Sequence, residues 1–324
     1  MKRCDCGKLL KAIDAFIEKA EGDLKDELAE AGFAEAGKTI DAISALEGDV
    51  AAALIEETEL FNAAIAEAGD LQTFARDIWP SLKENDKLAV KLKEIFKNRF
   101  SELMPGLVDT YLKQTDSELA ADRISNLTLG WIEEWSGQLA ELMQLNSHTE
   151  IEAILETGLA NGDGIAEFAQ NILDSGIRDE YYKARRVSLT EVLRAHNVAH
   201  QEATMQSPVV THKMWRHTGS YRNEPRENHV AMDGQTVGKA ERFTLQGRDG
   251  VIYYPMYPID PILPASESIN CHCISEDVVD PSILGMSLEE RQALQQEAID
   301  AMDAEWEAEL AAIDAANRAK AGIE

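Results

Sequence analysis

The chain has 324 residues, a formal net charge of −28 and a hydrophobic fraction of 44%. The apolar fraction is ordinary for a folded protein, which argues against global disorder, and the length suggests two or three domains. So acidic a chain repels polyphosphate on average. The charge therefore argues against a general nucleic-acid coat and favours basic partners or a simply solvated surface.

Neither a leader sequence nor a membrane helix is expected. Lys8, Lys11 and Asp14 interrupt any apolar region behind the N-terminal Met1-Lys2-Arg3. No run approaches the roughly eighteen apolar residues that a membrane helix needs. We therefore expect a protein that is made in a cytoplasm and does not enter a membrane.

Residues 1–155 are predicted to form a helical region, either a bundle or a set of long, partly extended helices. Apolar residues recur there at helical spacing in three stripes with acidic residues between them. The second stripe should stop at Pro105, where the missing N–H ends a helix. The stripes comprise Ile40, Ile43, Leu46, Val50, Leu54, Leu60, Phe61 and Ile65; Leu88, Leu92, Ile95, Phe96, Phe100 and Leu103; and Ile124, Leu127, Trp131, Ile132, Trp135, Leu139 and Leu142.

Residues 156–280 are predicted to form a small α+β domain. Two helices come first, the second running from about Asp179 to Met205, and Ser207-Pro208 ends it. Short bursts of β-branched and aromatic residues then predict strands. The expected strands are Val209–Trp215, Val251–Tyr254 and Ser268–Ile274.

Residues 281–324 are predicted to form an acidic C-terminal amphipathic helix, which completes a mainly α fold. Ser287 and Glu290 have the spacing of a capping box. The apolar stripe of this helix is narrow, so the helix needs a partner to be stable. Packing on its own domain and docking on a neighbouring subunit are equally good alternatives. The stripe consists of Leu294, Ala298, Met302, Trp306 and Leu310.

The four cysteines form two Cys-x-Cys pairs, Cys4/Cys6 and Cys271/Cys273, which in a reducing compartment indicate metal ligands or ordinary thiols. Cys271 and Cys273 lie two apart on a predicted strand, so their side chains share one face and His272 points to the other. A modest bend would bring both thiolates within about 2.3 Å of one zinc ion.

The sequence does not decide which residues would be the two remaining zinc ligands. His229 and His217 are the nearest candidates, and Cys4 and Cys6 are remote ones. The alternative is that the cysteines are small buried residues that hold a turn, with no cofactor at all.

A cluster of polar residues between the predicted strands is expected to form a rigid knot. Asp233-Gly234 is a strong turn signal, His229 could bond that turn or Thr218, and Arg226 could pair with Asp233. The knot comprises Thr218, Arg226, His229, Asp233, Gly234 and Asn270. The rival hypothesis is a metal-dependent nuclease or other hydrolase that uses His229, Asp233, Asn270 and His272. Because no complete catalytic set is evident, we do not expect an enzyme.

Basic residues gather locally despite the acidic total. Lys213, Arg216, Arg222 and Arg242 could face DNA phosphates. The alternative is that they form ion pairs with the protein's own acidic helices.

The order of these motifs is similar to that of a known family. Trp215 and Thr218 are followed by Arg-x-x-His-x-x-x-Asp-Gly, a proline-rich stretch and a closing Asn-Cys-x-Cys, and a helix with Arg-x-x-x-Thr-Glu at Arg186–Glu191 precedes them. This series resembles the phage head morphogenesis family, also described as Mu protein F-like minor head proteins. It covers roughly residues 155–280, and the first 150 residues match nothing that we can name.

The resemblance implies a structural minor head protein of a tailed phage. Such a protein is made in the host cytoplasm and ends in the virion, in the capsid interior at the portal vertex, in a small number of copies. Its implied partners are the portal protein, other head proteins and packaged DNA. Its implied roles are head assembly, DNA packaging and DNA ejection.

Overall fold

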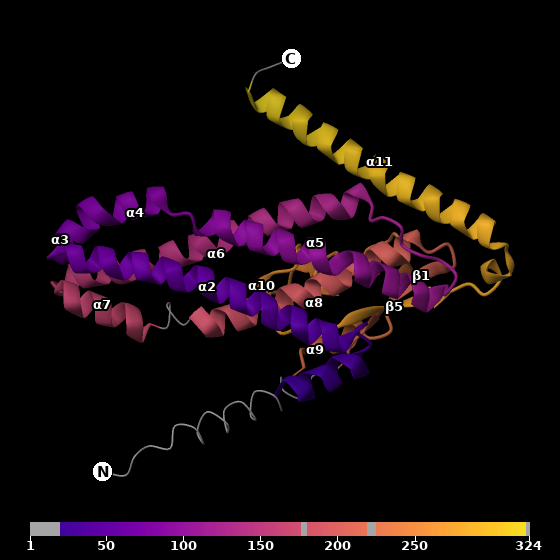
Figure 1. Ribbon diagram of the computed structural model, residues 1–324, viewed down its shortest axis with the longest axis horizontal. Helices are drawn as coiled ribbons and strands as arrows, with labels where there is room; N and C mark the ends of the chain where they lie inside the picture. The colour runs from indigo at the N-terminus through magenta and orange to yellow at the C-terminus, as the bar shows by residue number, and fades with distance from the viewer. Residues whose placement is uncertain (1–19, 176–179, 219–224, 322–324) are drawn as a thin grey trace, which may run out of the picture. The chain divides into compact units, whose positions relative to one another are not determined.

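The computed structural model describes residues 20–175, 180–218 and 225–321. These residues form mainly helices with a few short antiparallel strands (Figure 1), which confirms the predicted fold class. A helical segment at 20–31 comes first. The helices that follow are α2 Ala36–Ala68, α3 Leu71–Thr73, the π-helical turn Phe74–Ile78, α4 Trp79–Asn85, α5 Leu88–Thr115, α6 Asn126–Asn161, α7 Ile165–Asp174, α8 Glu180–Gln206, α9 Glu227–Met232, α10 Ala265–Ser268, the 3-10 turn Ile283–Gly285 and α11 Leu288–Ala321.

Two compact units divide the chain. One contains the described residues up to Ile43, Leu103–Thr128 and the residues from Thr190 onward, and the other contains Ser44–Glu102 and Leu129–Leu189. We call them the sheet unit and the helical unit. This grouping differs from the three consecutive segments expected from the sequence, because the long helices contribute residues to both units.

The helical unit is built around an aromatic core. Phe61, Phe74, Trp79 and Phe168 are buried together, and Phe61 meets Phe74 and Trp79 edge to face at centroid distances of 5.7 and 6.1 Å. Such edge-to-face pairs add to the stabilisation that burial of the rings already gives. The aromatic residues of this half of the chain therefore have a structural role.

Helix α5 does not end at Pro105, so that prediction was wrong. The helix continues to Thr115 with the proline inside it. An internal proline costs roughly 3 kcal/mol. The residues around and beyond it bury enough apolar surface to offset that cost: Met104, Leu107, Val108 and Leu112 are each at most 1% exposed.

The sheet unit contains a three-stranded antiparallel sheet in the order β2-β1-β5. Its strands are β1 Val210–Arg216, β2 Thr236–Gly238 and β5 Ile274–Val279, while β3 Leu245–Gln246 and β4 Ile252–Tyr253 form a separate hairpin. The register of β1 on β5 ends with Trp215 opposite Ser275 and Arg216 opposite Ile274.

The strand predicted for Ser268–Ile274 was wrong in position. Its first residue closes the short helix α10, a turn follows at residues 269–270, and β5 begins only at Ile274. Asn270 has a positive φ of 57°, which interrupts any extended backbone there. The strands expected for Val209–Trp215 and Val251–Tyr254 agree with β1 and β4.

Helix α8 is the buried element of the sheet unit, although its composition is polar. Every residue from 190 to 204 is buried. The polar side chains in this stretch are paired: Arg194 Nε donates to Glu191 Oε2 at 2.9 Å, and Glu202 accepts from the amide and the hydroxyl of Ser125 at 2.8 and 2.7 Å. Buried charges need such partners to be tolerated.

His196 on α8 joins three segments of the sheet unit through a buried hydrogen-bond chain. Its Nε2 lies 2.9 Å from Thr39 Oγ1 and its Nδ1 lies 3.0 Å from the Tyr111 hydroxyl, which accepts from the Ala34 amide at 3.1 Å. Burial lowers the pKa of His196 to about 3, so its ring is neutral near pH 7.

We predict that Tyr111→Phe lowers the free energy of unfolding by about 1–3 kcal/mol, because it leaves the Ala34 amide and one nitrogen of His196 without their partner. Tyr254→Phe is the matched control, because Tyr254 is 52% exposed, and it should change stability by less than about 0.5 kcal/mol. Chemical denaturation of both variants measures the difference. Equal unfolding free energies of the two variants would show that the hydrogen bonds through His196 do not contribute to stability.

Helix α11 packs on its own unit along its first half only. Ser287 and Glu290 form the expected capping box, with Ser287 Oγ 2.8 Å from Glu290 Oε2. Arg291, which is 3% exposed, pairs with Asp116 at 2.6 Å, and Ile299 and Met302 are buried. Residues 307–320 are all exposed. The first half is therefore packed on described residues of its own unit, whereas the second half is exposed.

Candidate metal centre

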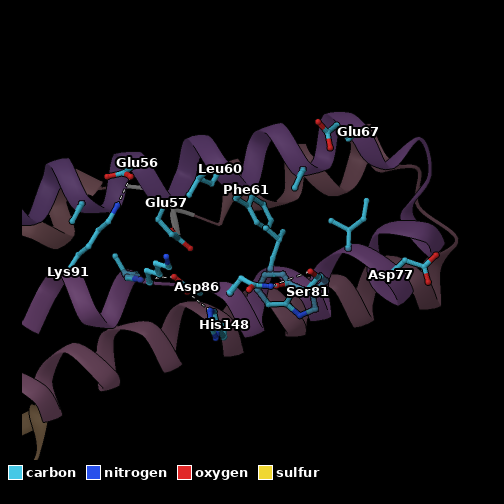
Figure 2. Close-up of a pocket in the computed structure, with 18 residues that line it drawn as sticks. Glu56, Glu57, Leu60, Phe61, Glu67, Asp77, Ser81, Asp86, Lys91 and His148 are labelled. Carbon is cyan, nitrogen blue, oxygen red and sulfur yellow. Dashed lines mark hydrogen bonds and ion pairs between the residues drawn. The ribbon is translucent and has the colours of Figure 1, made fainter.

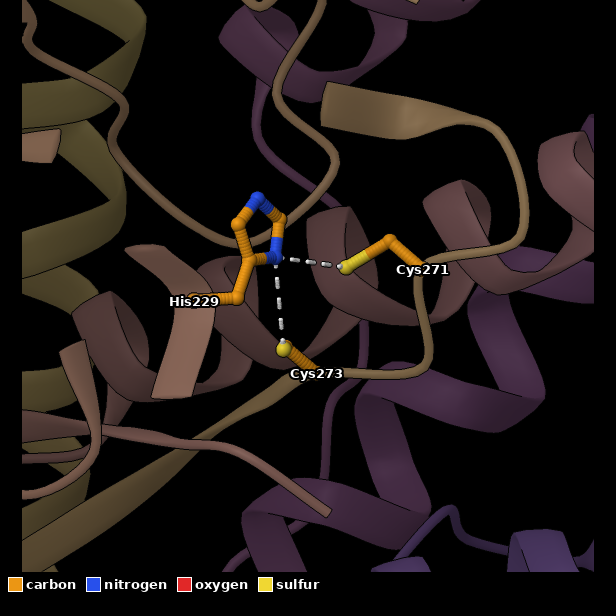
Figure 3. A group of neighbouring side chains, drawn as sticks. All are labelled: His229, Cys271 and Cys273. Carbon is orange, nitrogen blue, oxygen red and sulfur yellow. Dashed lines mark hydrogen bonds between the residues drawn. The ribbon is translucent and has the colours of Figure 1, made fainter. Parts of the chain in front are cut away.

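His229, Cys271 and Cys273 form a buried cluster in the sheet unit. His229 lies on α9, and the cysteines lie in the segment between α10 and β5. The His229 Nδ1 atom is 3.5 Å from Cys271 Sγ and 3.7 Å from Cys273 Sγ (Figure 3). The three residues are 1%, 3% and 3% exposed. Their ligand atoms all lie within 4.8 Å of one another.

The pairing of β1 with β5 brings a second histidine to this cluster. His217 directly follows β1 and Cys273 directly precedes β5, so the two continue the register that ends at Arg216 and Ile274. His217 is half-buried, and its Nδ1 lies 3.6 Å from Cys273 Sγ. His217 therefore lies beside the cluster of three, in contact with Cys273.

Glu267 on α10 fixes the ring of His229 from the other side. Its Oε2 lies 2.9 Å from His229 Nε2, and it is 1% exposed. Burial opposes ionisation of this carboxyl, but hydrogen bonds from the Arg248 amide and from Asn228, together with His229, lower its pKa below the usual value. Glu267 is therefore an ionised acceptor that leaves His229 Nδ1 directed at the sulphurs.

The two thiols share their environment. A hydrogen bond from Cys273, opposed by burial and aided by His229, holds the pKa of Cys271 well below its usual value. The same contact, with burial, raises the pKa of Cys273 well above it. The contact between the two sulphurs therefore favours a single negative charge on the pair.

The hydrogen bonds of the predicted knot differ in detail from the expectation. Arg226 does not pair with Asp233; its Nε donates to the Ser266 carbonyl at 2.8 Å and its other end bonds the Ile269 carbonyl. These carbonyls lie at the end of α10, where a cation stabilises the helix. Arg226 therefore anchors the segment that carries the cysteines.

Asp233 and Thr218 also have partners that the sequence did not indicate. Asp233 Oδ1 accepts from the His217 amide at 2.9 Å, and Thr218 Oγ1 donates to the His272 carbonyl at 2.8 Å. The turn at Gly234 has the positive φ, 83°, that its glycine suggested. The hydrogen bonds of Asp233 and Thr218 therefore fix the backbone beside His217 and between the two cysteines.

His272 points away from the cluster, as the spacing of the Cys-x-Cys pair indicated. Its Nδ1 lies 2.9 Å from Glu27 Oε1, and both side chains are buried. Glu27 belongs to the helical segment 20–31. Glu27 and Glu267 are the site residues that sequence reasoning missed, because no spacing rule links a glutamate to a histidine so far along the chain.

The basic residues proposed to face DNA differ in their surroundings. Lys213 is fully buried, and its Nζ donates to Gln201 Oε1 at 2.9 Å and to the Met256 carbonyl at 2.7 Å, so its assignment to a DNA-facing surface was wrong. Arg216 pairs with Glu276 at 2.9 Å. Arg242 bonds the Tyr254 carbonyl at 3.1 Å. Arg222, Cys4 and Cys6 lie outside the described residues.

We predict that Lys213 makes stability depend on pH. Burial lowers its pKa from 10.5 to about 7, so between these values the unfolded chain binds a proton that the folded chain does not. The unfolding free energy of the wild type, relative to Lys213→Met, should therefore rise with pH across this window by up to about 1.4 kcal/mol per pH unit. Denaturation profiles of both proteins between pH 7 and about 10 measure it. Parallel profiles would contradict the assignment.

The helical unit has a groove between α2, α4 and the start of α5 (Figure 2). Phe61 and Trp79 lie in its lining, and acidic residues line it as well. Lys91 pairs with Glu56 there, and His148 Nε2 lies 2.7 Å from Asp86 Oδ2. The groove therefore combines apolar surface with ion pairs made inside the unit, and no set of metal-ligand type is found in it.

Comparison with known proteins agrees with the resemblance drawn from the motifs. Residues 149–276 match the family model described as Phage Mu protein F like protein. The uncharacterised protein YqbB of Bacillus subtilis (strain 168) is 37% identical over 216 residues, which cover 64% of this chain and 70% of YqbB. No solved structure matches the chain.

The chain belongs to the Mu protein F-like family, a family of phage head morphogenesis proteins. The matched residues include α8, strands β1 to β4, the first three residues of β5 and the whole His/Cys cluster. Within the described part of the chain, none of the helices combines the length and the apolar character needed to span a bilayer.

Proposed function

We propose that this protein is a structural minor head protein of a tailed phage. It is located at the portal vertex inside the capsid, in a small number of copies, and acts in head assembly, DNA packaging or ejection. Its partners are the portal protein and other head proteins. The observation that supports this proposal most is that polar residues of the matched family region hydrogen-bond within that same region and so stabilise its fold.

The burial and the hydrogen bonds of the site residues support a role in structure and binding over a role in catalysis. His229 and Glu267 are 1% exposed, and Thr218 and Arg226 bond backbone carbonyls that flank the cysteines. A catalytic group needs to reach a substrate, usually in a cleft that admits it. A cluster this buried is suited to stabilising a domain.

A metal-dependent nuclease is the alternative, and the geometry does not favour it. Asp233 accepts from the His217 amide, His272 faces Glu27, and Asn270 is an exposed turn residue. Among the described residues, the only metal-ligand group is His229 with the two cysteines, and it includes neither Asp233 nor His272. The four residues of the nuclease hypothesis therefore do not share one reaction centre.

The second half of α11 is the surface that we assign to a partner in the particle. It is exposed from residue 307 to residue 320, and Leu310 and Ile313 are 44% and 42% exposed. These apolar side chains lie three apart, on one side of the helix. An amphipathic helix that is isolated in water is marginal, so contact with another head protein would stabilise this half.

We predict that ending the chain after Trp306 reduces incorporation into phage particles while leaving the protein folded. Residues 307–320 are exposed, so the unfolding midpoint should change by less than about 2 °C. Incorporation is measured by quantitative mass spectrometry of particles assembled with each variant.

A charge-matched control separates lost contact from lost length. Leu310→Gln with Ile313→Gln keeps the helix length and the formal charge and replaces only the two apolar side chains. It should reduce incorporation as much as the truncation does. Normal incorporation of both variants would contradict a partner contact at this half of α11.

We predict that His229→Ala lowers the unfolding free energy by about 1–3 kcal/mol, because Glu267 loses its buried partner. His212→Ala, a change on the exposed side of β1, is the matched control and should have little effect. The wild type should not hydrolyse DNA or RNA with Mg²⁺, Mn²⁺ or Zn²⁺ present. Metal-dependent hydrolysis that His229→Ala abolishes without loss of stability would establish the nuclease instead.

A further inference from the structure

We propose that Cys271, Cys273, His229 and His217 bind one zinc ion, and that this ion is structural. The two sulphurs and the Nδ1 atoms of the two histidines are the ligand atoms. The inference concerns the fold of the family region and stands apart from the role of the protein in the particle.

The spacing of the ligand atoms is that of a tetrahedral zinc site. Zn–S bonds of about 2.3 Å and Zn–N bonds of about 2.0–2.1 Å at tetrahedral angles place a sulphur and a nitrogen about 3.6 Å apart. The His229 Nδ1 atom is 3.5 and 3.7 Å from the two sulphurs, and His217 Nδ1 is 3.6 Å from Cys273 Sγ. Three sulphur–nitrogen edges of the tetrahedron are therefore already in place.

His217 completes the set. It lies outside the group of three whose ligand atoms are all within 4.8 Å of one another, so its ring needs to move towards Cys271 and His229. His217 is half-buried at the end of β1, whereas the other three ligands are buried, so a rotation of the His217 side chain is the movement that the four-ligand site requires. Its backbone is held in place, because the His217 amide donates to Asp233 at 2.9 Å.

The surroundings of His229 have the arrangement that supports a metal ligand. A ligating histidine usually donates its other ring N–H to a carboxylate, which fixes the tautomer and the ring direction. Glu267 Oε2 accepts from His229 Nε2 at 2.9 Å, and the Arg248 amide and Asn228 in turn bond Glu267. Trp215 packs edge-on against the same ring, with the centroids 5.9 Å apart.

The composition of the site indicates a structural ion. Two thiolates and two imidazoles fill all four tetrahedral positions, whereas a catalytic zinc keeps one position for water or substrate. Both thiols release their protons when the ion binds. The ion would join the end of β1, helix α9 and the segment before β5.

The first test is the metal content of the full-length wild type, purified without chelators from zinc-supplemented medium. We expect one zinc per chain by plasma mass spectrometry. Exchange for Co²⁺ should give the sulphur-to-cobalt charge-transfer bands of a tetrahedral thiolate site. Removal of zinc with a strong chelator should lower the unfolding midpoint by at least about 5 °C. Wild-type protein that carries no zinc, or a disulfide between Cys271 and Cys273, would overturn the proposal without any variant.

Variants then assign the ligands. Cys271→Ser should retain less than about a tenth of the zinc, and Glu267→Gln should weaken zinc binding by roughly 10–100-fold while leaving the ligand set intact. His217→Ala should bind zinc more weakly and change the cobalt spectrum. An unchanged spectrum would exclude His217 and with it the four-ligand set.

Two controls address the other cysteines and histidines. His212→Ala removes an exposed histidine from β1, and a double change of Cys4 and Cys6 to Ser removes the remote cysteine pair. Both should keep one zinc per chain. Loss of zinc in the Cys4/Cys6 variant, with retention in Cys271→Ser, would place the ion elsewhere and contradict the assignment.

Discussion

Antiparallel pairing of β1 with β5 is the constraint on which the sheet unit depends. Once Arg216 lies opposite Ile274, the next residues on each strand, His217 and Cys273, have to be neighbours. The two-residue spacing of the cysteines then places Cys271 Sγ on the same side as Cys273 Sγ, where His229 meets both. A slip by one residue would turn these side chains to the opposite face.

One principle recurs at three buried histidines of the sheet unit, which is that each has a polar partner on another segment of the chain. His229 has Glu267, His272 has Glu27, and His196 has Thr39 and Tyr111. Such networks specify one arrangement of a core because any alternative leaves a buried group unpaired. The same burial separates these residues from solvent, which agrees with the structural role that we propose.

Sequence patterns that span only a few residues predicted much of the fold. The helical stripes, the capping box at Ser287 and the strand ending at Trp215 rest on rules that act within a few residues, and α2, α11 and β1 agree with them. Spacing alone also indicated that Cys271 and Cys273 share a face. The failures needed tertiary information: α5 continues through Pro105 because its neighbours are buried, and Lys213, an ordinary surface residue by type, is enclosed beside Gln201 and Met256. Glu267 could not be assigned because the fold, not the spacing, brings α10 to His229.

X-ray absorption at the zinc edge, recorded on the purified full-length protein, tests the central claim most directly, because it reports the atoms around the ion without any substitution. If the buried cluster closes the end of the β1–β5 ladder around a zinc ion, the spectrum should fit two sulphur atoms at about 2.3 Å and two imidazole nitrogens at about 2.0 Å. A first shell of oxygen and nitrogen atoms alone, or the lack of a zinc edge in folded protein, would contradict the account.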